Sequence, residues 1–261
     1  MQMRIGIFDS GLGGLLIAKA IRKALPQYDY VYLGDTKRVP YGNRSQEIVF
    51  EFTKEAVDYL FEKEDCAIVI IACNTASARA LRRIQKEYPD RKVLGVLIPA
   101  AEEAAKFYRI GVLGTVGTIN SNTFPKEIKK LNKKAIVFQN PAPMLVPLVE
   151  NGEIKMAGNF IKKYLTPLLS KKIEALVLGC THYPILKYQI KNEIPKNVKI
   201  ISQDEIVPRK LKDYLLRHPE ITEKLSKKKS IKILVTDKTK NMEVLAKKWF
   251  GSSSKISLIE I

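Results

Sequence analysis

Two cysteines, Cys73 and Cys180, follow apolar runs that are nearly alike. The first run is AIVIIA at residues 67–72, and the second is ALVLG at residues 175–179. Each thiol is followed by hydroxyl or amide side chains and then by a helical pattern. A continuous apolar run of this length is typical of a buried parallel strand, and ligands bind beyond the carboxyl ends of such strands. The pattern therefore places two thiols where chemistry is usually done.

Two similar thiols suit a reaction that needs an acid and a base on opposite faces of one carbon. We expect the helix that starts after each cysteine to lower the thiol pKa from about 8.5, which makes the thiol a usable general base near neutral pH. One thiol then removes a proton and the other delivers one, which inverts a stereocentre. Nucleophilic catalysis is the alternative, but it usually pairs one thiol with a histidine base. Cys66 begins its strand instead of ending it and is expected in the core.

Other polar residues also follow expected strands. Asp9 ends the first strand and leads into a glycine-rich turn at residues 10–14, whose spacing fits neither a dinucleotide-binding loop nor a Walker loop. We expect the backbone N–H groups of this turn to form a nest that suits a carboxylate. A polar loop at residues 34–42 follows the second strand, and Glu150 ends an apolar helical segment.

Strand and helix patterns alternate along the 261 residues, which indicates an α/β fold with mainly parallel sheets flanked by helices. The two cysteines are 180 − 73 = 107 residues apart, about one domain length. The strand pattern also restarts near residue 110. We therefore expect two similar α/β domains with the active site in the cleft between them.

Composition argues against several kinds of protein. No run of 18 or more apolar residues occurs, so no membrane-spanning helix is expected. The first residues lack the pattern of a signal peptide. Three cysteines without a CxxC pair, together with two histidines, argue against a disulfide framework and against a zinc site. We therefore expect a cytoplasmic protein that has no metal site and no contact with a membrane.

The net charge of +18 suggests nucleic-acid binding as a different class of function. The lysines are spread over many expected helices, however, and the one run, residues 227–229, has no interleaved aromatic residues. We interpret the charge as a solvated surface and do not expect a nucleic-acid partner.

Six motifs in order resemble those of the glutamate racemases, within the aspartate/glutamate racemase superfamily. They are IGIFDSGLGG at residues 5–14, GDTKRVPYG at 34–42, ACNTASA at 72–78, GVLGTVGT at 111–118, LVPLVE at 145–150 and LGCTHYP at 178–184. The resemblance implies a cofactor-independent enzyme that interconverts L- and D-glutamate with two cysteine thiols. It also implies a homodimer, and a role in supplying D-glutamate for peptidoglycan and so for the cell wall and cell shape.

The resemblance also implies a domain division and a set of site residues. The first domain would comprise residues 1–97 plus 206–261 and carry Cys73, and the second would comprise residues 98–205 and carry Cys180. Cys73 would take the α-proton of D-glutamate, and Cys180 that of L-glutamate. Asp9 would assist Cys73, whereas His182 and Glu150 would assist Cys180. Substrate would be held by Asp9, Ser10, Pro40, Tyr41, Gly42, Asn74, Thr75, Thr115, Thr118, Thr181 and His182.

Two alternatives and one departure remain. Aspartate is the near alternative substrate, although aspartate racemases often carry an acid where His182 stands. Pyridoxal phosphate is an alternative for any racemase, but no phosphate-binding motif stands out, so no cofactor is expected. The expected loop SQDE at residues 202–205 replaces the family's usual Asp-Ser pair, which puts the contacts of this segment in doubt.

Overall fold

The computed structural model describes residues 2–251 and 256–261. Its strands form two separate sheets, and the paired strands are parallel throughout. The first sheet has the order β10-β9-β2-β1-β3-β4, and the second has the order β6-β5-β7-β8. The strands are β1 (Arg4–Asp9), β2 (Tyr30–Gly34), β3 (Cys66–Ile71), β4 (Lys92–Gly95), β5 (Arg109–Gly114), β6 (Ile136–Pro141), β7 (Ala175–Gly179), β8 (Lys199–Ile201), β9 (Ile231–Val235) and β10 (Ile256–Leu258).

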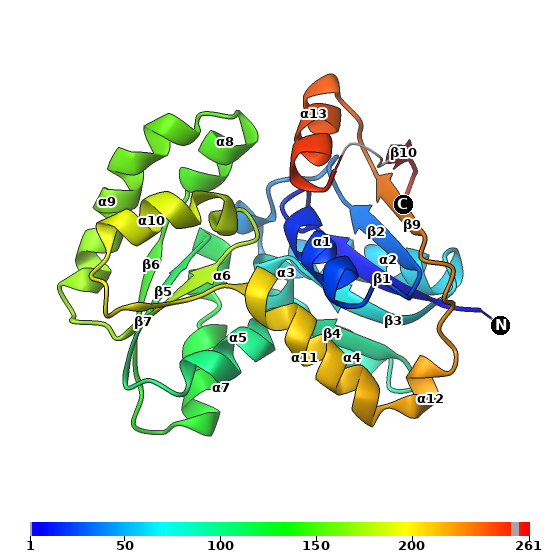
Figure 1. The fold of residues 1–261 in the computed structure, drawn as a ribbon, viewed down its shortest axis with the longest axis horizontal. Helices are drawn as coiled ribbons and strands as arrows, with labels where there is room; N and C mark the ends of the chain where they lie inside the picture. Colours follow the sequence, from blue (N-terminus) through cyan, green and yellow to red (C-terminus); the bar gives the residue numbers. More distant parts are fainter. Residues whose placement is uncertain (1, 252–255) are drawn as a thin grey trace.

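Helices cover both sheets and connect their parallel strands (Figure 1). They are α1 (Leu15–Ala24), α2 (Gln46–Glu62), α3 (Asn74–Arg79), α4 (Leu81–Glu87), α5 (Leu97–Ala104), α6 (Val116–Asn120), α7 (Thr123–Leu131), α8 (Leu145–Glu150), α9 (Ala157–Leu169), α10 (Lys187–Glu193), α11 (Gln203–Arg217), α12 (Pro219–Thr222) and α13 (Lys240–Trp249). The short 3-10 helices in the described residues are η1 (Tyr41–Asn43), η2 (Ile154–Met156) and η3 (Tyr183–Leu186). In the described part of the chain, no helix combines the length and apolarity needed to cross a membrane.

The central strands are apolar because both of their faces are covered. Every residue of β7 is buried, and β3 is buried except for one partly exposed alanine. Strands covered by helices on both faces need such continuous apolar runs, whereas a half-exposed strand would alternate. The expected α/β fold with parallel sheets and flanking helices is therefore confirmed.

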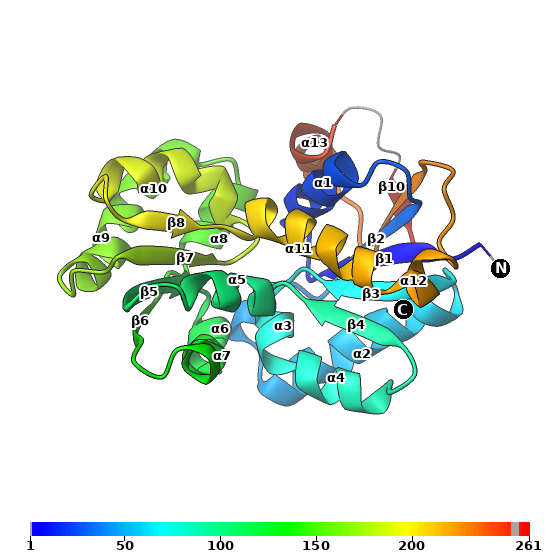
Figure 2. The same ribbon diagram turned by 60° about the horizontal axis from the view of Figure 1, so that its bottom comes forward.

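The two sheets lie side by side in separate halves of the molecule (Figures 1 and 2). The larger sheet is built from strands within residues 4–95 and 231–258, and the smaller one from strands within residues 109–201. Helix α11 runs from the smaller half across to the larger one, where it packs against α1 (Figure 2). We propose that the two halves are domains with the boundaries expected from the sequence, at residues 97/98 and 205/206.

Residues 203–205 are not a loop, as the sequence suggested, but the first turn of α11. Asp204 and Glu205 stand in this turn, where negative side chains are favourable beside the positive end of the helix dipole. The Ser202 hydroxyl also hydrogen-bonds the Asp204 carboxylate. The extra turn places Gln203 beside α3, which the expected loop did not suggest.

Candidate active site

The carboxyl ends of four strands surround one cavity. β1 and β3 are neighbours in the larger sheet, and β5 and β7 are neighbours in the smaller one. Cys73 and Cys180 follow β3 and β7, and both line a cavity of about 250 Å³. This volume suits a ligand of amino-acid size. The sequence-predicted residues that line it are Ser10, Pro40, Tyr41, Gly42, Cys73, Asn74, Thr75, Thr115, Glu150, Cys180, Thr181 and His182.

Two predicted site residues, Asp9 and Thr118, are fully buried behind this lining. The Thr118 hydroxyl lies 3.0 Å from the Thr115 hydroxyl and 3.4 Å from that of Thr75. The Thr75 and Thr115 hydroxyls are themselves 2.8 Å apart, although the two residues follow strands of different sheets. Thr118 therefore supports two hydroxyls of the lining from behind.

The nest of backbone amides after β1 is filled by the side chain of Asp9. Its Oδ2 atom accepts a hydrogen bond from the Gly11 amide over 3.0 Å, and the Gly14 amide also bonds this carboxyl. From the sequence we expected a nest for a bound anion such as a carboxylate, whereas in the structure the Asp9 side chain supplies the carboxylate. These two amides are therefore occupied by Asp9.

Asp9 is enclosed in the protein interior below the cavity. Burial raises the pKa of its carboxyl, and the electrostatic effect of His182 and the amide hydrogen bonds act in the opposite direction. The Thr181 hydroxyl donates to Asp9 Oδ1 over 3.4 Å, so this carboxyl joins the ends of β1 and β7.

The pKa of the Cys73 thiol is raised, whereas the sequence predicted that it would be lowered. Cys73 caps the start of α3, and the Ala76 amide donates to its sulfur over 3.5 Å. Burial nevertheless raises the pKa of Cys73 to about 12, and the nearby Asp9 carboxyl adds to this effect. The expected lowering is therefore wrong for Cys73, because desolvation of the thiolate outweighs the hydrogen bonds that it receives.

Cys180 lies at the start of a three-residue polar chain. The Cys180 sulfur is 3.7 Å from Nδ1 of His182, and Nε2 of the same ring is 3.0 Å from Oε1 of Glu150. Burial alone would lower the pKa of His182, but its hydrogen bonds to Cys180 and Glu150 outweigh burial and raise the pKa to about 10. His182 can therefore hold a proton between the sulfur and the carboxylate at neutral pH.

The surroundings of the two thiols are thus unequal. Cys73 has a buried carboxyl nearby, in Asp9, and keeps its proton at neutral pH. Cys180 faces an imidazole that holds a proton, and that imidazole is backed by a carboxylate. The cavity thus offers a protonated thiol on the Cys73 side and a sulfur beside a protonated imidazole on the Cys180 side.

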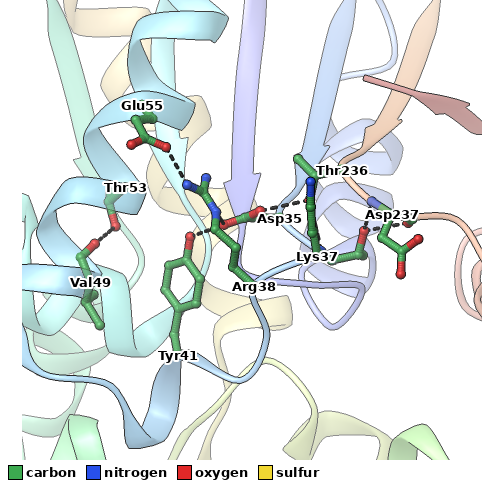
Figure 3. A network of polar contacts seen from close by, with 10 residues as sticks. Asp35, Lys37, Arg38, Tyr41, Val49, Thr53, Glu55, Thr236 and Asp237 are labelled. Atoms are coloured by element: carbon green, nitrogen blue, oxygen red, sulfur yellow. Dashed lines mark hydrogen bonds and ion pairs between the residues drawn. The ribbon is translucent and has the colours of Figure 1, made fainter. Parts of the chain in front are cut away.

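A polar network holds the loop that carries Tyr41 (Figure 3). The Tyr41 hydroxyl donates to Asp35 Oδ2 over 2.5 Å, and Arg38 Nε donates to the same oxygen over 2.6 Å. The Thr236 hydroxyl, just after β9, donates to Asp35 Oδ1 over 2.8 Å. Asp35 is fully buried and was not predicted as a site residue, although it belongs to one of the six motifs.

Several lining residues were not expected as site residues from the sequence. Most of them are apolar or lack an ionisable group, so they shape the cavity and exclude water. These additional lining residues are Gly11, Val39, Asn43, Val116, Pro143, Val146, Pro147 and Asn151. Five of them lie within the quoted motifs, namely Gly11, Val39, Val116, Val146 and Pro147, whereas Asn43, Pro143 and Asn151 lie outside the motifs.

Neutral hydrogen-bonding groups dominate the polar part of the cavity. Among the residues that the structure describes, the lining contains no lysine and no arginine. The same part of the chain holds no group of three His, Cys, Asp or Glu side chains placed to bind a metal ion. A negatively charged ligand would therefore be held mainly by hydroxyls and amides, beside the protonated His182.

Residues 16–206 match the Asp/Glu/Hydantoin racemase family. A glutamate racemase of Aquifex aeolicus is 41% identical over 95% of this chain and 94% of its own length. The crystal structure of a glutamate racemase isoform from Bacillus anthracis superposes with a TM-score of 0.91 at 36% identity, covering 99% of this chain and 98% of the other. The Francisella tularensis glutamate racemase, solved in complex with D-glutamate, gives a TM-score of 0.91 at 30% identity, with the same coverage of 99% and 98%.

Proposed function

The chain belongs to the Asp/Glu/Hydantoin racemase family and is an isomerase, and from that premise we propose that it interconverts L- and D-glutamate with Cys73 and Cys180 as acid and base. The observation that carries the mechanism is that both thiols line one small cavity, each at the end of a strand of a different sheet. Inversion at a carbon needs proton transfer on two opposite faces, and two thiols that reach one cavity from different sheets can supply it.

The unequal surroundings of Cys73 and Cys180 suggest how the protons move during the reaction. In the direction from L to D, the Cys180 sulfur takes the α-proton as thiolate after His182 has accepted the thiol proton. The electron pair left on the α-carbon is then protonated by the Cys73 thiol from the opposite face. One proton enters Cys180 and one leaves Cys73, so the two thiols exchange roles. The raised pKa values of Cys73 and His182 keep both side chains protonated at neutral pH. This is the protonation state that the reaction of L-glutamate requires.

Glutamate is the proposed substrate because the relatives that share nearly the full length are glutamate racemases, one of them solved with D-glutamate bound. The hydroxyls of Thr75 and Thr115, together with the amide of Asn74, offer neutral donors for its carboxylates. Aspartate, which is one methylene shorter, is the alternative to test beside it.

The proposed reaction needs no cofactor. A pyridoxal-phosphate enzyme requires a lysine amine in its site, and the described lining residues include none. We further propose that the product serves peptidoglycan synthesis and that the enzyme is a cytoplasmic homodimer, as the resemblance implies.

Circular dichroism with L-glutamate in D₂O tests the mechanism. Wild-type protein without added cofactor should lose the optical signal and incorporate deuterium at the α-carbon. Cys73→Ser and Cys180→Ser should each abolish racemisation, because each removes one of the two proton-transfer groups. Cys66→Ala is the matched control, since Cys66 is a buried thiol in the core away from the cavity. Turnover of aspartate but not glutamate would move the substrate, and full activity in either serine variant would refute the two-thiol mechanism.

A further inference from the structure

A hydrogen bond joins the first residues of two helices behind the cavity. Gln203 begins α11 and Asn74 begins α3, and Gln203 Nε2 donates to Asn74 Oδ1 over 2.8 Å. Both side chains are almost entirely buried, with Gln203 0% and Asn74 2% exposed. Asn74 lines the cavity directly after Cys73, whereas Gln203 lies behind it. The contact therefore links α11, which runs between the two halves of the molecule, to a residue of the site.

In the structure, this hydrogen bond engages the oxygen end of the Asn74 amide. An asparagine amide carries one acceptor, Oδ1, and one donor group, Nδ2. Because Gln203 occupies Oδ1, the donor is left over, and Nδ2 is buried without a protein partner among the described residues. A buried donor without a partner is costly. A ligand that brings an acceptor into the cavity would remove this cost.

From this contact we propose that Gln203 is a positioning residue that holds the Asn74 amide with its Nδ2–H group available to a substrate carboxylate. The reverse orientation would offer Oδ1, which suits the substrate ammonium instead. The inference rests on the proposed function, because it assigns the group that Asn74 recognises on the amino acid. It also gives a role to residues 202–205, where the glutamate racemases usually carry an Asp-Ser pair.

The unmet hydrogen bond of the Gln203 side chain supports a functional role for this contact. Its Oε1 atom is also buried without a partner among the described residues. An apolar side chain at this position would avoid that unpaired acceptor, so stability alone does not explain a glutamine here. Buried polar groups with unmet hydrogen bonds are expected where a protein serves function at the expense of stability.

Gln203→Glu tests the inference because an ionised carboxylate can accept but cannot donate a hydrogen bond. The variant is assayed at alkaline pH, since burial would raise the pKa of the new carboxyl. It would draw Asn74 Nδ2 toward residue 203 and turn Oδ1 to the cavity, where Oδ1 repels a substrate carboxylate. We expect KM for glutamate to rise about tenfold or more, the effect of one hydrogen bond to a charged group, with kcat changed much less. The melting temperature should rise on adding D-glutamate to wild type, and by less in the variant.

Two further measurements separate positioning from damage. Gln85→Glu is the matched control, because Gln85 Nε2 also makes a single 2.8 Å hydrogen bond, to the Val93 carbonyl, outside the cavity. It should leave KM unchanged. In an Asn74→Ala background, Gln203→Glu should raise KM no further, since Gln203 acts through Asn74.

The possible outcomes distinguish the role of Gln203 from the proposed racemase function on which it rests. An active wild type whose KM is unchanged by Gln203→Glu, or an equal rise of KM in the Asn74→Ala background, would overturn the role of Gln203 alone. A wild type that neither binds nor turns over glutamate would overturn the proposed function, and the inference with it. A tenfold rise that disappears in the Asn74→Ala background would establish the positioning role.

Discussion

Nε2 of His182 lies 3.0 Å from Oε1 of Glu150, while Nδ1 of the same ring faces the Cys180 sulfur at 3.7 Å. One imidazole thus connects a carboxylate at the end of α8 to a thiol at the end of β7. Trp249 of α13 packs edge-on against the ring, with centroids 5.9 Å apart, so the ring has little freedom to turn away. The contacts of the ring with Glu150 and Cys180 explain why His182 keeps its proton although it is buried.

Glu150→Gln should shift the pH dependence of racemisation. The carboxylate helps to raise the pKa of His182 to about 10, so its removal should lower that pKa and move the alkaline limb of kcat/KM to lower pH. We expect kcat/KM at neutral pH to fall about tenfold, the effect of one hydrogen bond to a charged group. Because L- and D-glutamate have equal free energies, the fall must be the same in both directions, which provides an internal check.

Glu153→Gln is the control for this variant, since Glu153 is exposed, lies three residues further along the chain and does not line the cavity. It should leave the pH profile in place. An alkaline limb that stays at the wild-type pH in Glu150→Gln would show that the carboxylate does not govern the proton on His182.

Much of the site could be predicted because its residues cluster in short motifs at strand ends. Cys73 and Cys180 follow apolar runs, and their neighbours Asn74, Thr75 and Thr181 come with them. Gln203 could not be found in this way, because its partner is 129 residues distant in the chain and the contact exists only once α11 and α3 are packed. Asp35 was missed for a similar reason, since its bond to Thr236 joins residues 201 apart.

The pKa of Cys73 shows a second limit of local reasoning. The start of α3 directly after the thiol is a local feature and is present as expected. The depth of burial and the nearness of Asp9 depend on how the larger sheet, its helices and the opposite half pack together. These tertiary effects outweigh the local helix effect, so the pKa of Cys73 is raised instead of lowered.

Gly13→Ala should damage the site because the turn after β1 presses against the segment after β7. A Cβ atom at residue 13 would lie 2.5 Å from the Thr181 hydroxyl and 2.7 Å from the His182 ring. Both groups would have to shift, and forcing extra atoms into a packed region costs about 1–3 kcal/mol. We expect kcat/KM to fall at least about tenfold and the melting temperature to drop.

Gly158→Ala is the matched comparison, because no atom lies within 4 Å of the corresponding Cβ position on α9. Alanine in a helix is more stable than glycine by about 0.5–1 kcal/mol, so this variant should melt at a slightly higher temperature with unchanged activity. Equal activity in the two alanine variants would show that the contact between the two halves at Gly13 is not tight in solution.

Asp29→Asn should reveal how the lysine run at residues 227–229 is held in place. Asp29 is 2% exposed and accepts hydrogen bonds from the Ser226 hydroxyl, the Lys228 amide, and both the hydroxyl and the amide of Ser230. Burial would raise the pKa of Asp29, but these hydrogen bonds outweigh it and lower the pKa to about 2. The buried Asp29 carboxylate thus anchors the loop that contains the lysine run.

The lowered pKa fixes the sign of the pH dependence. The ionised carboxylate contributes stability in full above its ordinary pKa of 3.8, and that contribution is lost as the pH falls toward 2. We expect Asp29→Asn to reduce the free energy of unfolding by about 2 kcal/mol at pH 7, with the difference from wild type shrinking below pH 4. Urea unfolding of both proteins between pH 3 and pH 7 measures this. Asp90→Asn, at an exposed position, should stay within about 0.5 kcal/mol of wild type, and a loss for Asp29→Asn that does not vary with pH would contradict the assignment.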